Sequence, residues 1–156
     1  MARVLSAVAE APQGAVLFHC AAGKDRTGII AAMLLAAADV EPDEIAEDYS
    51  ISTDYIRDTY LAVSPPEARE AILEEVRCPP EQIYNMLAHL KNRYGGTRGY
   101  LRFIGLGNPD IERIRSRLLP HSVSCRFAVR AIPSPRTGKM IRRSMQAAES
   151  RPGSLP

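Results

Sequence analysis

Cysteine is scarce in this sequence, with three residues, Cys20, Cys78 and Cys125, among 156. An odd number of widely spaced thiols argues against the disulfide framework of small secreted domains and favours a reducing compartment. Cys78 and Cys125 also lack the set of histidine and cysteine partners that a zinc site requires at regular spacing. We therefore expect free thiols, one of which can be reactive, and no metal.

Long apolar runs are missing as well. The longest, residues 28–38, is about half of the roughly 20 residues that a membrane-spanning helix requires, so it predicts a buried core helix. Residues 1–12 form a poor secretory signal, because Ser6 and Glu10 interrupt their apolar stretch. No internal repeat is visible. These absences predict a cytoplasmic protein.

The composition, 46% hydrophobic and 24% charged, is typical of an ordinary globular domain. We expect one folded region, residues 1–119, which Pro120 closes, and a basic, disordered tail at 120–156. The tail is rich in Ser, Pro, Arg and Gly, and charge alone would let it approach an anionic membrane, although a solvated tail is the favoured interpretation. No nucleic-acid partner is expected.

Hydrophobic periodicity predicts a strand at about 15–19 followed by about six helices. The strand is a short apolar run, Ala15 to Phe18, bounded by Gly14 and His19. A further short helix precedes it at 2–10. The six helices are expected at 27–39, 42–58, 65–76, about 80–94, 97–104 and 108–119.

The motif that carries chemistry is residues 19–28, His-Cys-Ala-Ala-Gly-Lys-Asp-Arg-Thr-Gly. A cysteine and an arginine are separated by five residues, after an apolar run and before a helix. Such a turn directs backbone N–H groups and the positive end of the helix dipole at one point, where a phosphate dianion fits. The same field lowers the pKa of the Cys20 thiol, and the thiolate is the nucleophilic form.

Each neighbour of the cysteine has an expected role. The planar fork of Arg26 can bind two phosphoryl oxygens, which stabilises an in-line transfer to sulfur. Thr27 can donate its hydroxyl to the thiolate, and His19 can order the loop from behind. Gly23 and Gly28 permit the backbone torsions of a cradle. The alternative is a chance match, in which Cys20 is a core residue and Arg26 a surface charge.

These ten residues resemble the signature of the protein tyrosine phosphatase superfamily, and are most similar to its bacterial tyrosine and phosphoinositide phosphatase branch. The resemblance continues through Asp48-Tyr49-Ser50 and Tyr94-Gly95-Gly96 and spans about residues 12–119. It implies an α/β fold of the cysteine phosphatase type, present only in its C-terminal, mostly helical part.

By this resemblance Cys20 is the nucleophile, and no metal or organic cofactor is implied. The substrates implied are phosphotyrosine proteins and, since lipid phosphatases carry a lysine at the position of Lys24, phosphoinositides. A merely solvated Lys24 is an equal alternative. The phosphate-binding residues implied are Ala21, Ala22, Gly23, Lys24, Asp25, Arg26 and Thr27.

The sequence departs from the family pattern before the motif. The family takes its general acid from an aspartate upstream of the cysteine, yet residues 1–19 contain none. Asp25 is the one carboxylate expected within reach of a leaving group, and Glu10 is a poor substitute. A lone strand also cannot form a parallel sheet. We therefore keep a second hypothesis: a C-terminal portion, misassigned start or truncated remnant that binds phosphate without efficient turnover.

Other classes of thiol enzyme use a similar loop. Arsenate reductases and low-molecular-weight phosphatases use an Asp-Pro acid, which this chain lacks, and sulfurtransferase loops are one residue shorter before the arginine. Both are disfavoured.

Tyr55 and Tyr60 are candidates for an aromatic entrance to the site, although core or rim packing is the favoured interpretation.

Overall fold

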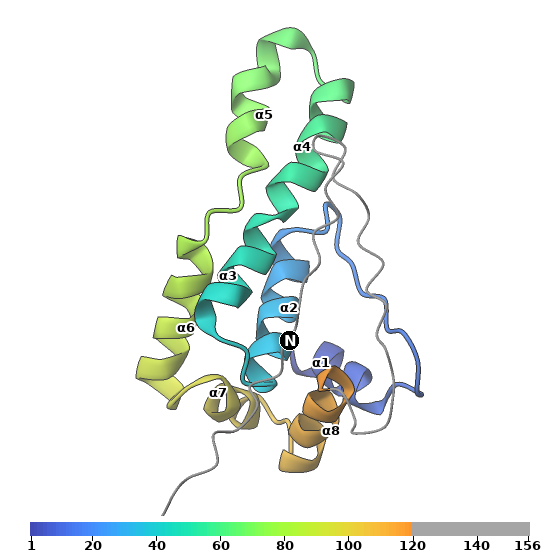
Figure 1. Cartoon of the computed structure of the whole chain (residues 1–156), viewed down its shortest axis with the longest axis vertical. Helices are drawn as coiled ribbons and strands as arrows, with labels where there is room; N and C mark the ends of the chain where they lie inside the picture. The colour runs from blue at the N-terminus through green and yellow to red at the C-terminus, as the bar shows by residue number, and fades with distance from the viewer. Residues whose placement is uncertain (120–156) are drawn as a thin grey trace, which may run out of the picture. The chain divides into compact units, whose positions relative to one another are not determined.

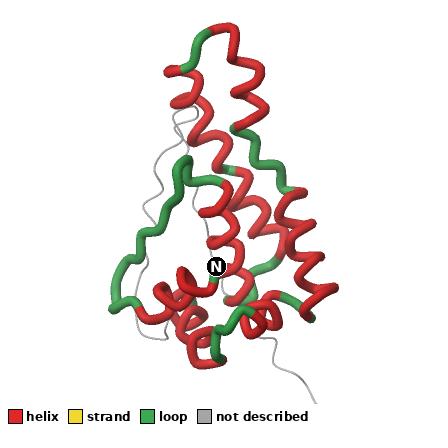
Figure 2. Tube along the Cα trace, turned by 180° about the vertical axis from the view of Figure 1, so that it is seen from behind, coloured by secondary structure: helices red, strands yellow, loops and turns green. Residues whose placement is uncertain are grey.

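The computed structural model describes residues 1–119, which fold into helices joined by loops (Figure 1). A long loop separates the first two helices, and shorter connections join the others (Figure 2). These residues lie in the first of two units into which the chain divides, Met1–Val123 and Ser124–Pro156. The elements are α1 (Ala2–Glu10), α2 (Asp25–Ala37), α3 (Pro42–Ser50), α4 (Ser52–Val63), the 3-10 helix η1 (Pro66–Ala68), α5 (Arg69–Glu75), α6 (Glu81–Tyr94), α7 (Thr97–Phe103) and α8 (Asn108–Leu118).

Helix α2 lies at the centre of the packing. It is built from Ala, Leu, Ile and Met on most faces, and it contacts α3, α7 and α8. Ile30, Met33 and Leu34 are buried, whereas Ile29 near the beginning of the helix is 37% exposed. The prediction of a core helix in this stretch is confirmed.

Two groups of buried side chains hold the helices together. The larger group joins α1, α2, α6, α7 and α8, and includes the fully buried Leu5 and Leu101. The smaller group joins α2, α3 and α6 with the link before α6. It contains Ala32, Ile45, Ala46, Tyr49, Cys78 and Ile83.

The expected strand at 15–19 is wrong for the described part of the chain. This segment has no strand assignment, Val16 is 38% exposed and Leu17 is 91% exposed. Its backbone makes no backbone hydrogen bond to any other described residue. A strand requires a neighbouring strand that satisfies its N–H and C=O groups, and the described residues supply none. The expectation of a mostly helical part is confirmed.

The expected helix count also differs. Seven α-helices follow the loop in the described part, rather than six, because the helix predicted at 42–58 is divided at Ile51 into α3 and α4. The hydroxyl of Ser50 donates to the carbonyl oxygen of Ala46 at 2.8 Å, a back-bond that commonly bends helices. The segment predicted as 65–76 begins with η1 before α5. Gly95, at φ +74°, ends α6 as the sequence predicts.

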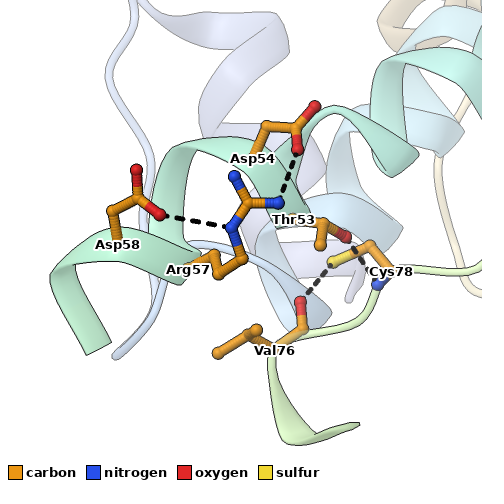
Figure 3. A network of polar contacts seen from close by, with 6 residues as sticks. All are labelled: Thr53, Asp54, Arg57, Asp58, Val76 and Cys78. Atoms are coloured by element: carbon orange, nitrogen blue, oxygen red, sulfur yellow. Dashed lines mark hydrogen bonds and ion pairs between the residues drawn. The ribbon is translucent and has the colours of Figure 1, made fainter. Parts of the chain in front are cut away.

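Helices α4 and α5 form a pair that extends away from the other helices (Figures 1 and 2). Neither helix contains a buried residue. At the base of the pair, the backbone N–H of Cys78 donates to the Thr53 hydroxyl at 2.9 Å, while the Cys78 thiol donates to the Val76 carbonyl at 3.7 Å (Figure 3). Of the residues that make these two hydrogen bonds, Val76 and Cys78 are buried, so polar contacts and the edge of the core together hold the pair at its base.

Asp39 connects the end of α2 to two other helices. It has φ 61°, which is uncommon for a residue other than glycine. Its carboxylate accepts hydrogen bonds from Arg98 of α7, at 3.1 and 3.2 Å, and from Arg115 of α8. Because Asp39 is more than half exposed, each ion pair stabilises the fold by about 0 to 1 kcal/mol, and orientation is its main effect.

Two further sequence expectations concern membrane-spanning helices and the C-terminal tail. No helix among residues 1–119 is long and apolar enough to cross a membrane. The expected disordered tail, its possible membrane contact, and Cys125 within it lie outside the described residues.

The larger core makes a stability prediction. Leu101→Ala should lower the free energy of unfolding by about 2 to 5 kcal/mol, because Leu101 is 0% exposed and its removal leaves a cavity. Leu73→Ala is the matched control on α5, where the side chain is 42% exposed, and should cost less than about 1 kcal/mol. Urea denaturation measures both. Equal losses would contradict the assignment of the core.

Candidate active site

The candidate site begins where the exposed extended segment reaches Cys20. The chain then turns through residues 21–24 and enters α2 at Asp25. Gly23 makes this turn possible, since its φ of +74° lies in the left-handed region that other residues rarely adopt. No side chain caps the beginning of α2, so its first backbone N–H groups are open to an anion.

Four groups lower the pKa of the Cys20 thiol to about 6. The largest effect comes from the Thr27 hydroxyl, followed by the backbone N–H of Thr27, the backbone N–H of Gly23 and the positive charge of Arg26. Burial of the thiol opposes them, with an effect smaller than those of the Thr27 groups but larger than those of Gly23 and Arg26. A thiol with a pKa of about 6 is roughly nine-tenths thiolate at pH 7. The sequence expectation of a reactive thiol therefore has a local physical cause.

The Thr27 hydroxyl oxygen is buried and has no regular hydrogen-bond partner among the described residues. The hydroxyl nevertheless has the largest effect on the pKa of the Cys20 thiol. Its interaction with the sulfur therefore falls outside the usual distance and angle limits of a hydrogen bond. Catalytic hydrogen bonds are commonly long or poorly aligned in free enzymes and tighten around the substrate. The hydroxyl is thus available to donate to the thiolate, which is the role that the sequence predicts.

Arg26 lies in the first turn of α2 with an exposed side chain. Its positive charge is the smallest of the effects that lower the pKa of Cys20. It forms no hydrogen bond or ion pair with another residue of the described part. The guanidinium fork is therefore free to bind an oxyanion.

Lys24 and Asp25 contact each other. The Lys24 ammonium lies 3.1 Å from the Asp25 carboxylate, and the two side chains are 14% and 62% exposed. Because the Asp25 carboxylate is exposed to solvent, the pair is worth about 0 to 1 kcal/mol, so a competing phosphate can displace the carboxylate. Nothing in the described structure joins Asp25 to the thiol.

His19 is exposed, and its ring folds back onto the loop. The Nδ1 atom lies 3.0 Å from the carbonyl oxygen of Cys20, so a protonated Nδ1 donates to the backbone at the cysteine. This contact is compatible with the ordering role that the sequence suggests. Ala21 and Ala22 contribute backbone alone to the turn.

Gly28 has a different role from the one expected. Its backbone is helical rather than left-handed, so torsional freedom is not what position 28 requires. A Cβ atom there would lie 2.6 Å from Cδ2 and 2.7 Å from Cε2 of Tyr49. The ring of Tyr49 therefore packs directly on the backbone of α2. Sequence reasoning missed this contact because Tyr49 was identified only as an apolar helix position within the family-like Asp48-Tyr49-Ser50, which does not indicate what its ring contacts.

Other parts of the surface are not joined to the loop. A cavity of about 510 Å³ is lined by α1 and α8, including Glu10, Arg113 and Arg117, rather than by the motif. Tyr55 is 53% exposed and Tyr60 partly exposed, both on α4. Neither makes a hydrogen bond or ring contact with a residue of the loop, so the aromatic entrance stays a prediction.

A family model described as "Tyrosine phosphatase family" matches residues 1–120, which include the whole site. This chain belongs to the tyrosine phosphatase family. The match extends from α1 past the end of α8, so it covers every described element. The resemblance expected from residues 19–28 is therefore confirmed at the level of the family.

Two curated relatives are similar over much of the chain. A tyrosine-protein phosphatase of Nostoc commune is 38% identical over 126 residues, which cover 74% of this chain and 43% of that protein. The triple specificity protein phosphatase PtpB of Mycobacterium tuberculosis is 32% identical over 120 residues, covering 67% of this chain and 44% of that protein. This chain thus spans less than half the length of either relative. No solved structure matches it significantly.

The geometry of the thiol predicts the effect of Thr27. Thr27→Val removes the hydroxyl while keeping the shape, and should raise the pKa of Cys20 by about one unit toward the ordinary value of about 8.5. Thr27→Ser restores a hydroxyl and should keep the pKa near 6. Iodoacetamide alkylation of the Cys20 peptide as a function of pH, followed by mass spectrometry, measures both. An unchanged pKa in Thr27→Val would contradict the assigned cause.

Proposed function

We propose that this chain is a cysteine-dependent phosphatase that hydrolyses phosphotyrosine esters through a cysteinyl-phosphate intermediate. The observation that supports this best is the convergence of the N–H groups of Gly23 and Thr27 and the charge of Arg26 on one thiol, whose pKa lies at about 6. A structural cysteine in apolar surroundings has its thiol pKa raised instead. Membership of the tyrosine phosphatase family supports the same chemistry.

In the first step, the Cys20 thiolate attacks phosphorus as the nucleophile. The S–P bond forms while the bond from phosphorus to the tyrosine oxygen breaks, and that oxygen leaves with the electron pair and takes up a proton. Arg26 and the backbone N–H groups of the loop bind the equatorial oxygens and stabilise their charge in the transition state. In the second step, water attacks phosphorus, the S–P bond breaks, and phosphate and the thiolate are released.

The proton for the leaving oxygen needs a source. We propose Asp25 as the general acid, because it is the carboxylate of the phosphate-binding loop and is 62% exposed. General acid catalysis contributes about 10² to 10⁴ in rate, and it matters most for poor leaving groups. Because nothing in the described structure joins Asp25 to the thiol, its proton transfer should be inefficient, and the chain should favour aryl phosphates with acidic leaving groups over alkyl phosphates.

The nucleophile makes the first test. Cys20→Ser should reduce hydrolysis of p-nitrophenyl phosphate by at least about 10³-fold, because an alcohol of high pKa replaces the thiolate. Cys125→Ser is the matched control, since it makes the same change at a cysteine outside residues 19–28, and should leave turnover close to that of the parent chain. Vanadate should inhibit the parent chain. Equal rates in the parent and Cys20→Ser would overturn the proposal.

Lys24 suggests a second class of substrate within the same reaction. We propose that its ammonium exchanges Asp25 for a second phosphate group, which would extend the activity to phosphoinositides. The 14% exposure of the Lys24 side chain supports this, because the stem is fixed against the protein and presents its ammonium at the loop.

The specificity test compares two substrates. Lys24→Met should lower hydrolysis of a soluble phosphatidylinositol phosphate about tenfold more than hydrolysis of a phosphotyrosine peptide, because the second phosphate loses a charge-assisted contact of about 1.4 kcal/mol. Steady-state kcat/KM for the two substrates gives the ratio. Equal losses of kcat/KM on both substrates would indicate that Lys24 binds the phosphate group that the two substrates have in common.

One observation favours a second candidate function, a phosphate-binding protein without efficient turnover. The segment that leads to Cys20 is exposed at Leu17, and its backbone is unpaired among the described residues. A nucleophile on such a segment is poorly preorganised for in-line attack. Calorimetric binding of vanadate or phosphate with no hydrolysis of p-nitrophenyl phosphate would support this candidate over the enzyme.

A further inference from the structure

We propose that Tyr49 is a positioning residue for the candidate site, whose ring holds the first turn of α2 so that Thr27 faces Cys20. This inference rests on the proposed function, because it takes Cys20 as the nucleophile. It concerns a side chain from α3, outside the phosphate-binding loop and adjacent to Gly28 in space.

The first observation is the contact between the ring and the helix. A Cβ at position 28 would meet Cδ2 and Cε2 of Tyr49 at 2.6 and 2.7 Å, distances that real Cβ contacts essentially never show. Only glycine therefore lets α2 approach the ring this closely. Gly28 directly follows Thr27, so a displacement at position 28 moves the group with the largest effect on the thiol.

The second observation is that the ring cannot move aside freely. Tyr49 is 5% exposed and belongs to the smaller core. Its hydroxyl donates to Oε1 of Gln82 on α6 at 2.6 Å, so swinging the ring away from Gly28 would break this hydrogen bond. Burial raises the pKa of Tyr49 to about 12, which keeps the hydroxyl protonated as a donor over the working pH range. Tyr49 thus connects α6 to the backbone of the loop helix.

The geometry sets the expected effect of a methyl group at position 28. Gly28→Ala should push the first turn of α2 away from the ring and raise the apparent thiol pKa of Cys20 by about one unit, which lowers its alkylation rate at pH 5 about tenfold. The charges of Lys24, Asp25 and Arg26 remain unchanged in this variant. A shift therefore reports the position of Thr27 rather than a change in local charge.

The decisive experiment is a double-mutant cycle with Tyr49→Ala. If the added methyl group collides with the ring of Tyr49, Gly28→Ala should change the pKa of the Cys20 thiol by less than about 0.3 unit in the Tyr49→Ala background. Alkylation of the Cys20 peptide is measured in the full chain, and circular dichroism checks folding. Additive shifts, or no shift in Gly28→Ala alone, would overturn the inference.

A matched control separates positioning from general stability. Tyr84 of α6 also donates a tyrosine hydroxyl hydrogen bond between α6 and α3, to Asp43 at 3.0 Å, but it is exposed. Tyr84→Ala should leave the thiol pKa unchanged. A thiol pKa raised by about one unit in Tyr84→Ala, as expected for Gly28→Ala, would assign such shifts to loss of stability and would overturn the inference.

A second route covers the case in which Tyr49→Ala does not fold. Gln82 has an exposed side chain, so Gln82→Ala removes the tether of the ring while keeping the core. The thiol shift caused by Gly28→Ala should fall to about half in the Gln82→Ala background. The same full shift in both backgrounds would overturn the inference.

The readouts distinguish this inference from the proposed function. Alkylation reports the thiolate without requiring turnover, while hydrolysis of p-nitrophenyl phosphate reports the enzyme. A chain that shows the expected cycle but no hydrolysis would retain the role of Tyr49 and lose the proposed function. A chain that hydrolyses the substrate but shows no cycle would lose only the role of Tyr49.

Discussion

Helix α2 presents apolar side chains on most of its faces, and their burial against α3, α7 and α8 decides where its first turn lies. Removing the apolar surface of residues such as Met33 and Leu34 from water is favourable, and it holds the helix in one position among its neighbours. Arg26 and Thr27 stand on the same rigid element, one turn from the buried part. The groups that act on the thiol therefore take their positions from the core.

The thiol itself depends on a different kind of support. Cys20 follows a segment whose side chains include the 91% exposed Leu17 and whose backbone has no partner among the described residues. The sulfur is placed by the left-handed turn at Gly23, by the groups of the loop that act on it, and by Phe18, which packs against the larger core two residues before it. One side of the site is thus anchored by the packing of a whole helix, and the other by the loop and a single partly buried side chain.

This asymmetry matters for the comparison with the family. The described residues contain the thiol, the arginine and the loop between them, and the relatives that the chain matches are more than twice as long as the matched regions. The groups proposed to bind an oxyanion all lie within residues 19–28. Efficient transfer also requires an oriented nucleophile and a proton source, which makes turnover, rather than phosphate binding, the sensitive measure of the site.

Much of the fold and the site could be predicted from the sequence, because the signals are local. The spacing of Cys20 and Arg26 predicts the loop, proline and glycine predict the helix ends, and apolar composition predicts the buried α2. The strand at 15–19 could not be settled this way, since β structure depends on a distant partner.

The role of Gly28 could not be predicted from the sequence either. Its requirement for glycine comes from the ring of Tyr49, 21 positions later, and not from its own backbone torsion. By itself the sequence determined where the proposed phosphate chemistry would lie, because all of its candidate groups stand within ten consecutive residues. Only the tertiary structure decided how those groups are held, since close approach between helices depends on side chains that are far apart along the chain.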